Sequence, residues 1–159
     1  MFRDLIFRCA NKFMYWHQAY QTEKLKKALR FCGARVRVSP NAIIWGTDGV
    51  TLEDDVEINS YTHVFGGGGV RIGARTLISA CCSITSYTHG EEIHNRSNVI
   101  GFPITIEEDC WLGTGAIILP GVHIGRGSII GAGAVVTKDI PPMSVAIGVP
   151  ARVVRQIAQ

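Results

Sequence analysis

Residues 106–136 read IEEDCWLGTGAIILPGVHIGRGSIIGAGAVV, and every sixth residue of this stretch is aliphatic. The aliphatic positions are Ile106, Leu112, Ile118, Ile124, Ile130 and Val136. Because Ile, Leu and Val together make up about a quarter of the chain, five further matches from a given start have a chance probability of about one in a thousand. The regularity therefore indicates an internal repeat.

The same period of six extends toward the N-terminus. Its earlier members are Val38 and Ile44, then Leu52, Ile58 and Val64, then Ile72, Ile78 and Ile84. The steps from Ile44 to Leu52 and from Val64 to Ile72 are eight residues long, so two residues are inserted at each of these places.

A period of six matches neither the 3.6-residue helical repeat nor the alternation of a strand. It indicates short extended segments joined by turns, with one aliphatic side chain pointing inward per segment. Small residues follow many of these positions, for example Gly73 and Gly113, and we expect glycine there to relieve strain where the backbone turns. The pattern predicts an all-β fold, a parallel β-solenoid over residues 34–147, and disfavours a globular sandwich with coincidental spacing.

Residues 1–33 have a helical pattern. Apolar residues recur at spacings of four and three at Phe2, Ile6, Cys9, Phe13, Trp16 and Tyr20. Leu25, Leu29 and Cys32 continue the pattern on a second segment after Thr22, and Gly33 is placed where a helix would stop. We expect the apolar stripe to dock on the rest of the protein. Contact with a partner, or with a membrane surface near Arg3, Arg8 and Lys12, is the alternative.

Composition excludes several classes of protein. The 159 residues form one domain, and 47% apolar with 18% charged residues exclude a disordered tail. A net charge of +3 argues against a dedicated nucleic-acid binder, and no apolar run is long enough to span a membrane. The five cysteines form no CxxC pair, so we expect free thiols, no metal site and a cytoplasmic location.

Residues 85–103 interrupt the repeat. This loop contains two histidines, two glutamates and an arginine between regular segments. Insertions in a regular scaffold commonly carry function, so the loop is the first candidate for a site. Residues 148–159 form a separate C-terminal segment.

Three motifs resemble those of the hexapeptide-repeat acyltransferases, in the branch of the galactoside, maltose and polysaccharide O-acetyltransferases. They are SYTHG at 86–90, CWLGTG at 110–115, and IGAGAVVTKDIPP at 130–142 followed by GVPARVVR at 148–155. The resemblance covers about residues 36–157. It implies a left-handed parallel β-helix, a homotrimer, and acetyl-CoA bound in clefts between neighbouring copies, with the loop reaching over an adjacent subunit.

The resemblance also implies roles for single residues. His89 matches the catalytic histidine, a general base of a type that titrates near neutral pH. Asn59 and Trp111 correspond to substrate-binding residues, although a turn asparagine and simple packing are the ordinary alternatives. Ser79, Thr114 and Ala132 would line the path of the CoA arm through their backbones. The remaining contacts, with the CoA phosphates and ribose, would come from Thr137, Lys138, Arg152 and Arg155.

Two features of the sequence leave the identity of the acceptor substrate undetermined. Gly67 stands where the galactoside and maltose enzymes have an acceptor-binding aspartate, and the N-terminal segment does not match theirs closely. Glu91 or Glu92 is a weak candidate to orient His89.

We expect an acetyl-CoA-dependent O-acetyltransferase that acts on a sugar or polysaccharide precursor through a ternary complex. One alternative is an N-acetyltransferase on a nucleotide-linked amino sugar. Another is a zinc carbonic anhydrase-like solenoid, with His63, His89 and His94 as ligands. A catalytically silent scaffold subunit is the third.

Overall fold

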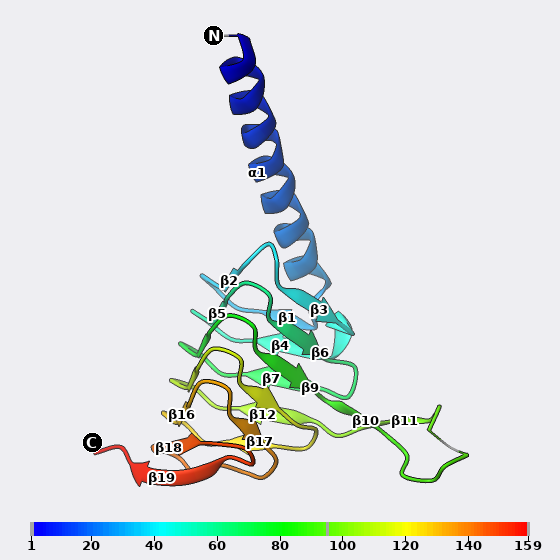
Figure 1. Cartoon of the computed structure of the whole chain (residues 1–159), viewed down its shortest axis with the longest axis vertical. Helices are drawn as coiled ribbons and strands as arrows, with labels where there is room; N and C mark the ends of the chain where they lie inside the picture. Colours follow the sequence, from blue (N-terminus) through cyan, green and yellow to red (C-terminus); the bar gives the residue numbers. More distant parts are fainter. Residues whose placement is uncertain (1, 95, 159) are drawn as a thin grey trace.

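The computed structural model describes residues 2–94 and 96–158, and for helix residues 2–6 and 8 it describes the backbone alone. One helix, α1 (Phe2–Ala28), leads into strands that wind around a common axis (Figure 1). All but two strand pairings are parallel and join successive coils. The chain is a parallel β-solenoid, as the six-residue period predicted.

Three sheets form the walls of the solenoid, and the chain visits them in turn. The first sheet contains β1 (Phe31–Cys32), β4 (Val50–Leu52), β7 (Val70–Ile72), β12 (Ile104–Ile106) and β15 (His123–Ile124). The second contains β2 (Arg37–Val38), β5 (Glu57–Ile58), β8 (Leu77–Ile78), β13 (Trp111–Leu112), β16 (Ile129–Ile130), β18 (Ser144–Ile147) and β19 (Arg152–Gln156). The third contains β3 (Ile43–Trp45), β6 (His63–Phe65), β9 (Ser83–Thr85), β14 (Ile117–Ile118) and β17 (Val135–Val136).

The predicted inward positions form the core. Every aliphatic residue of the six-residue series is buried, from Val38 and Ile44 at the N-terminal end to Val136, and none is more than 8% exposed. Each lies beside its equivalent in the next coil, as in the pairing of Leu112 with Ile78 and Ile130. A column of stacked aliphatic side chains therefore replaces the two-layer core of an ordinary domain.

All three departures from the period lie at one edge of the solenoid, where the third sheet connects to the first. The short 3-10 helix η1 (Thr47–Gly49) and the glycine run 66–69 are the two predicted insertions. The third is the loop between β9 and β12, which carries the hairpin of β10 (Tyr87–His89) and β11 (Val99–Gly101). We call the edge between the third and first sheets the insertion edge.

The N-terminal helix differs from its prediction. It ends at Ala28, and Phe31 and Cys32 form β1, which pairs with Thr51 and Leu52 of β4. Strand pairing with the next coil prevails there over the helical spacing. Gly33 therefore does not terminate the helix. Glycine is needed at this position because a Cβ would collide with the backbone of Asp54 in the next coil.

Glycine after an inward position has a different cause from the one predicted. At Gly73, φ is outside the left-handed region, but a Cβ would collide with the backbone of Glu108 in the next coil. The close approach of coils, and not strain in the turn itself, requires glycine there.

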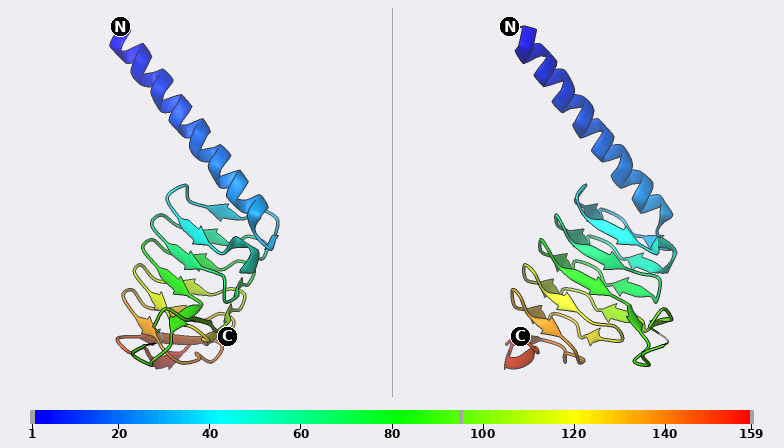
Figure 2. Two further views of the ribbon diagram at one scale, coloured as in Figure 1. Left: turned by 90° about the vertical axis from the view of Figure 1, so that its right-hand side faces the viewer. Right: turned by 45° about the vertical axis from the view of Figure 1, so that its right-hand side comes forward.

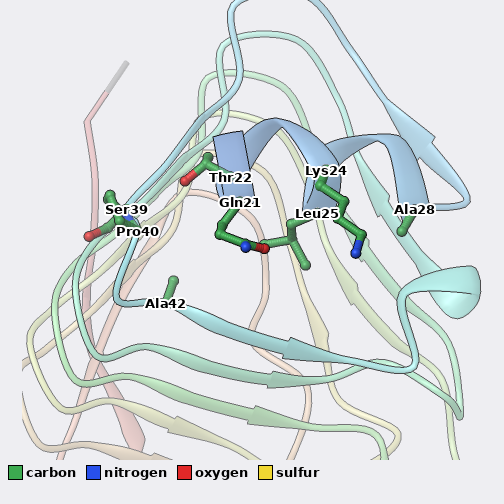
Figure 3. A pocket seen from close by; sticks show the side chains of 8 residues that line it. All are labelled: Gln21, Thr22, Lys24, Leu25, Ala28, Ser39, Pro40 and Ala42. Carbon is green, nitrogen blue, oxygen red and sulfur yellow. The ribbon is translucent and has the colours of Figure 1, made fainter. Parts of the chain in front are cut away.

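The prediction that the apolar stripe docks on the solenoid is wrong for the single chain. Leu29 is buried and Leu25 packs against the core, so the last turns cover the open end of the solenoid. Figure 3 shows Gln21 and Leu25 pointing from the helix toward Ala42 of the first coil, around a cavity of about 350 Å³. The rest of the helix projects away from the solenoid (Figure 2), and Phe13, Trp16 and Tyr20 are exposed. The side chains of Phe2 and Ile6 lie outside the described residues.

Ion pairs link the coils on the outer surface. Arg35 and Asp55 pair at 2.6 Å, as do Arg75 and Asp109. Hydrogen bonds from these guanidinium groups lower the pKa of both carboxyl groups below its usual range. Each pair links residues of two successive coils. Because the pairs are exposed, they contribute little to the stability of the fold.

Candidate functional site

His89 is the last residue of β10, in a hairpin that leaves the solenoid at the insertion edge (Figure 1). The hairpin is antiparallel, and His89 pairs with Val99 of β11. The imidazole is solvent-exposed, so a substrate can reach it without any rearrangement of the core.

Ser86 fixes the base of this hairpin. Its hydroxyl donates to the Phe65 carbonyl at 2.6 Å and accepts from the Gly68 N–H at 3.0 Å. The Ser86 carbonyl accepts from the Phe102 N–H at 2.8 Å, where the chain returns from the hairpin. The buried serine thus joins the third sheet, the glycine run and both strands of the hairpin, and this orients His89 relative to the solenoid.

An open cavity of about 780 Å³ adjoins His89. It is lined by Phe65, Thr85, Tyr87, His89 and Val99. Phe65 and Thr85 are paired neighbours at the ends of β6 and β9. The cavity therefore offers an imidazole, two aromatic rings and the hydroxyl groups of Thr85 and Tyr87 to one ligand.

Sequence reasoning missed Tyr87 and Phe65 as site residues. The available signal for Tyr87 was its place two residues before His89, because alternate residues of a strand face the same side. For Phe65 the signal was its place twenty residues before Thr85, the length of one coil with an insertion.

Gly67 has a structural role that involves Tyr87. A Cβ built on Gly67 would fall on the Tyr87 hydroxyl. The tyrosine ring therefore takes the space into which a side chain at position 67 would project.

The predicted residues of the CoA path line a different edge, between the second and third sheets. The turns after β8, β13 and β16 contain Ser79, Thr114 and Ala132, respectively. Backbone hydrogen bonds join successive turns; for example, the Gly133 N–H donates to the Thr114 carbonyl at 2.9 Å. Trp111 lies half-exposed beside them, and its indole N–H donates to the Ser79 hydroxyl at 3.0 Å.

Asn59 lies on the same edge, one coil before Ser79. Its side-chain amide donates to the Ile78 carbonyl at 3.2 Å, and its backbone N–H donates to the same oxygen at 3.0 Å. The amide oxygen stays available to a ligand, since no hydrogen bond to it is found among the described residues.

The predicted phosphate contacts are exposed. Thr137 and Lys138 follow β17 at the insertion edge, and Arg152 and Arg155 lie on β19. Within the described residues, Lys138 and Arg155 form no ion pair, whereas Arg152 donates to its neighbour's carbonyl at 2.8 Å. Unpaired cations of this kind suit a phosphate ligand.

The single chain therefore divides the predicted site between two edges. His89 and Lys138 belong to the insertion edge, whereas Asn59, Ser79 and Trp111 belong to the edge between the second and third sheets. The structure brings Ser79 and Trp111 into direct contact but leaves His89 apart from them.

The two buried cysteines, Cys82 and Cys110, lack the features of a nucleophile. All five cysteines are free, and burial raises the pKa of the Cys82 thiol and raises that of Cys110 to about 11. Across residues 2–94 and 96–158, no three His, Cys, Asp or Glu side chains are grouped so that they could hold a metal ion.

The fold and the six-residue repeat define the class of the protein, a hexapeptide-repeat solenoid. The family model for bacterial transferase hexapeptide (six repeats) matches residues 103–138. A galactoside acetyltransferase solved in complex with coenzyme A is 32% identical to this chain in sequence and has a TM-score of 0.75. The match covers 84% of this chain and 68% of the chain of that enzyme. This chain belongs to the hexapeptide-repeat acyltransferase family.

Two further relatives support this assignment. A hexapeptide-repeat acetyltransferase from Vibrio cholerae has a TM-score of 0.85 at 27% identity, over 89% of this chain and 82% of its own. The galactoside O-acetyltransferase of Escherichia coli is 47% identical over 90 residues, which are 55% of this chain and 44% of that enzyme. The chain spans about half the length of the curated relatives it matches.

Proposed function

We propose that this protein transfers the acetyl group of acetyl-CoA to a hydroxyl group of a sugar or polysaccharide precursor, with His89 as the general base. The observation that carries the proposal is the position of His89, exposed at the end of a hairpin and beside an open cavity with aromatic walls. The named galactoside O-acetyltransferase relatives support the reaction class.

The chemistry needs one base and no covalent enzyme intermediate. As the acceptor oxygen forms its bond to the thioester carbonyl carbon, its proton moves to the His89 imidazole. The carbon–sulfur bond then breaks, and the proton passes from His89 to the departing sulfur. The direct route agrees with the burial and raised pKa of the Cys82 and Cys110 thiols, which make them poor nucleophiles.

The residues present suit acetyl-CoA as the donor. Thr114 and Ala132 are exposed, so their backbone N–H groups can donate to the carbonyl groups of an amide-bearing arm. Lys138 and Arg155, which form no ion pair with any residue that the structure describes, offer positive charge to the phosphates. Two solved relatives support this donor, since one was crystallised with acetyl-CoA and one with coenzyme A.

We infer that the working unit is a homotrimer. In one chain, His89 lies at one edge of the solenoid and Trp111 beside another, so a cleft between two copies can bring them to one ligand. Each site would then take its base from one copy and its tryptophan from a neighbour.

The acceptor would be recognised without a carboxylate at position 67. The Tyr87 hydroxyl takes that space, and a phenol can both donate to and accept from a sugar hydroxyl.

The orienting role of Glu91 or Glu92 stays a prediction. The location in the reducing cytoplasm also stays a prediction.

A thiol-release assay with acetyl-CoA tests the proposal. We expect release of free CoA with an uncharged sugar or oligosaccharide from a panel that also contains nucleotide-linked amino sugars, serine and buffer alone. Product mass spectrometry should give an ester, which mild alkali removes. An alkali-stable amide on an amino sugar would replace the proposal with N-acetylation, and no thiol release with any acceptor would contradict it.

A further inference from the structure

Residues 9–20 of α1 carry apolar side chains that no other described residue covers. Side chains three and four residues apart lie on one face of a helix, which places Cys9, Phe13, Trp16 and Tyr20 in one stripe. All four are exposed. Trp16 and Tyr20 stack at 6.1 Å between ring centroids, so these two rings form one aromatic surface within the stripe. We call these four residues the aromatic stripe.

The positive charge of the chain is concentrated on the same helix. Residues 2–28 contain six Lys or Arg residues and two acidic residues, whereas the rest of the chain contains ten basic and eleven acidic residues. Of the two acids, Glu23 forms an ion pair with Lys26 at 3.0 Å. The helix is therefore basic and the rest of the chain slightly acidic, so the helix suits a partner that carries negative charge.

We propose that α1 lies on an anionic lipid surface, with the aromatic stripe in the headgroup region and its basic residues on the phosphates. Trp and Tyr favour this region because one end of each side chain is apolar and the other is polar. A helix of 27 residues is about 40 Å long, so it provides an extended contact. No described helix is both long and apolar enough to cross a bilayer. An aromatic stripe flanked by basic residues suits a position along the lipid surface.

Pairing with α1 of a second copy is the competing explanation, and the charges disfavour it. The 4-3-4 spacing of the stripe resembles a coiled-coil seam, but the two positions that would continue the seam are Glu23 and Lys27. The positions that would flank the seam include Lys12, Lys24 and Lys26 and no acid. Parallel copies would therefore bring like charges together, whereas anionic lipid would neutralise them.

The position of the helix leaves the candidate active site free. α1 leaves the solenoid at its N-terminal end, and the β10–β11 hairpin leaves it toward the opposite end (Figure 1). Contact of α1 with lipid does not require the cavity beside His89, so soluble acceptors should be acetylated equally well by protein with a weakened stripe.

Co-sedimentation of the full chain with vesicles tests the proposal. We expect the protein to bind phosphatidylcholine vesicles that contain 30% phosphatidylglycerol at ~0.1 M salt, at least ~10-fold more strongly than pure phosphatidylcholine, and to be released at ~0.5 M salt. Phe13→Ser/Trp16→Ser should weaken binding at least ~10-fold. The matched control, Phe7→Ser/Tyr15→Ser, removes two exposed aromatic residues that point away from the stripe and should change binding less than ~2-fold.

Two further measurements make the result decisive. Circular dichroism should show equal helicity in both double variants, and sedimentation equilibrium in the absence of lipid should give the wild-type mass for both. Wild-type protein that stays in solution with anionic vesicles, or a stripe variant that binds as the wild type does, would overturn the proposal. A stripe variant with a lower solution mass and unchanged vesicle binding would identify a second copy as the occupant instead.

Discussion

Replacing His89 by Ala is expected to lower turnover by a factor on the order of 10²–10⁴, because the acceptor hydroxyl then loses its proton acceptor. The side chain is exposed at the end of β10 and supports no part of the core, so the variant should keep the wild-type melting temperature. Acetyl-CoA binding, measured by calorimetry, should stay near normal. His89→Asn, which keeps hydrogen bonding but cannot take the proton, should be equally slow.

His17→Ala is the matched control for this experiment. His17 is also exposed, but it lies on α1, where it stacks on Phe13. Its replacement should leave turnover of a soluble acceptor unchanged. If His89→Ala keeps activity close to that of the wild type, the general-base assignment is wrong. If it loses acetyl-CoA binding as well as turnover, His89 acts in donor binding.

Replacing both Lys138 and Arg155 by Ala is expected to raise the KM for acetyl-CoA at least ~10-fold while kcat changes little. Hydrogen bonds between cationic side chains and phosphate are among the stronger ones in water, and they bind a part of the donor far from the reacting carbonyl. Contacts made equally in the ground state and the transition state change KM and leave kcat alone. Initial rates over a range of acetyl-CoA concentrations measure both constants.

The control for this double variant removes the same charge elsewhere. Lys27 and Arg126 are exposed and belong to neither edge of the candidate site, so Lys27→Ala/Arg126→Ala should leave both constants unchanged. An equal rise in KM with the control would point to the general charge of the protein. An unchanged KM in Lys138→Ala/Arg155→Ala would mean that the phosphates bind elsewhere.

Much of the fold could be predicted because the repeat is local. One aliphatic side chain per six residues is enough to fix the inward direction, and Ile72, Leu112 and Ile130 are all fully buried as the period required. The two eight-residue steps were also informative, since both lie on the insertion edge with the hairpin.

The predictions that failed depend on neighbours that the local pattern does not contain. Cys32 fits the helical spacing, but it pairs with Leu52, twenty residues away, and becomes part of β1. The spacing of the stripe that includes Trp16 predicts contact with the solenoid, yet only the last turns of α1 reach it. Tyr87 was missed because its relation to Gly67 exists only once two coils are stacked.

A crystal structure of the protein with bound CoA tests the central claim most directly. We expect a trimer in which CoA lies between two copies, with His89 of one copy and Trp111 of the next on either side of the sulfur. The same density would contradict the account if CoA lay within a single copy, or if the imidazole of His89 faced solvent away from the thiol.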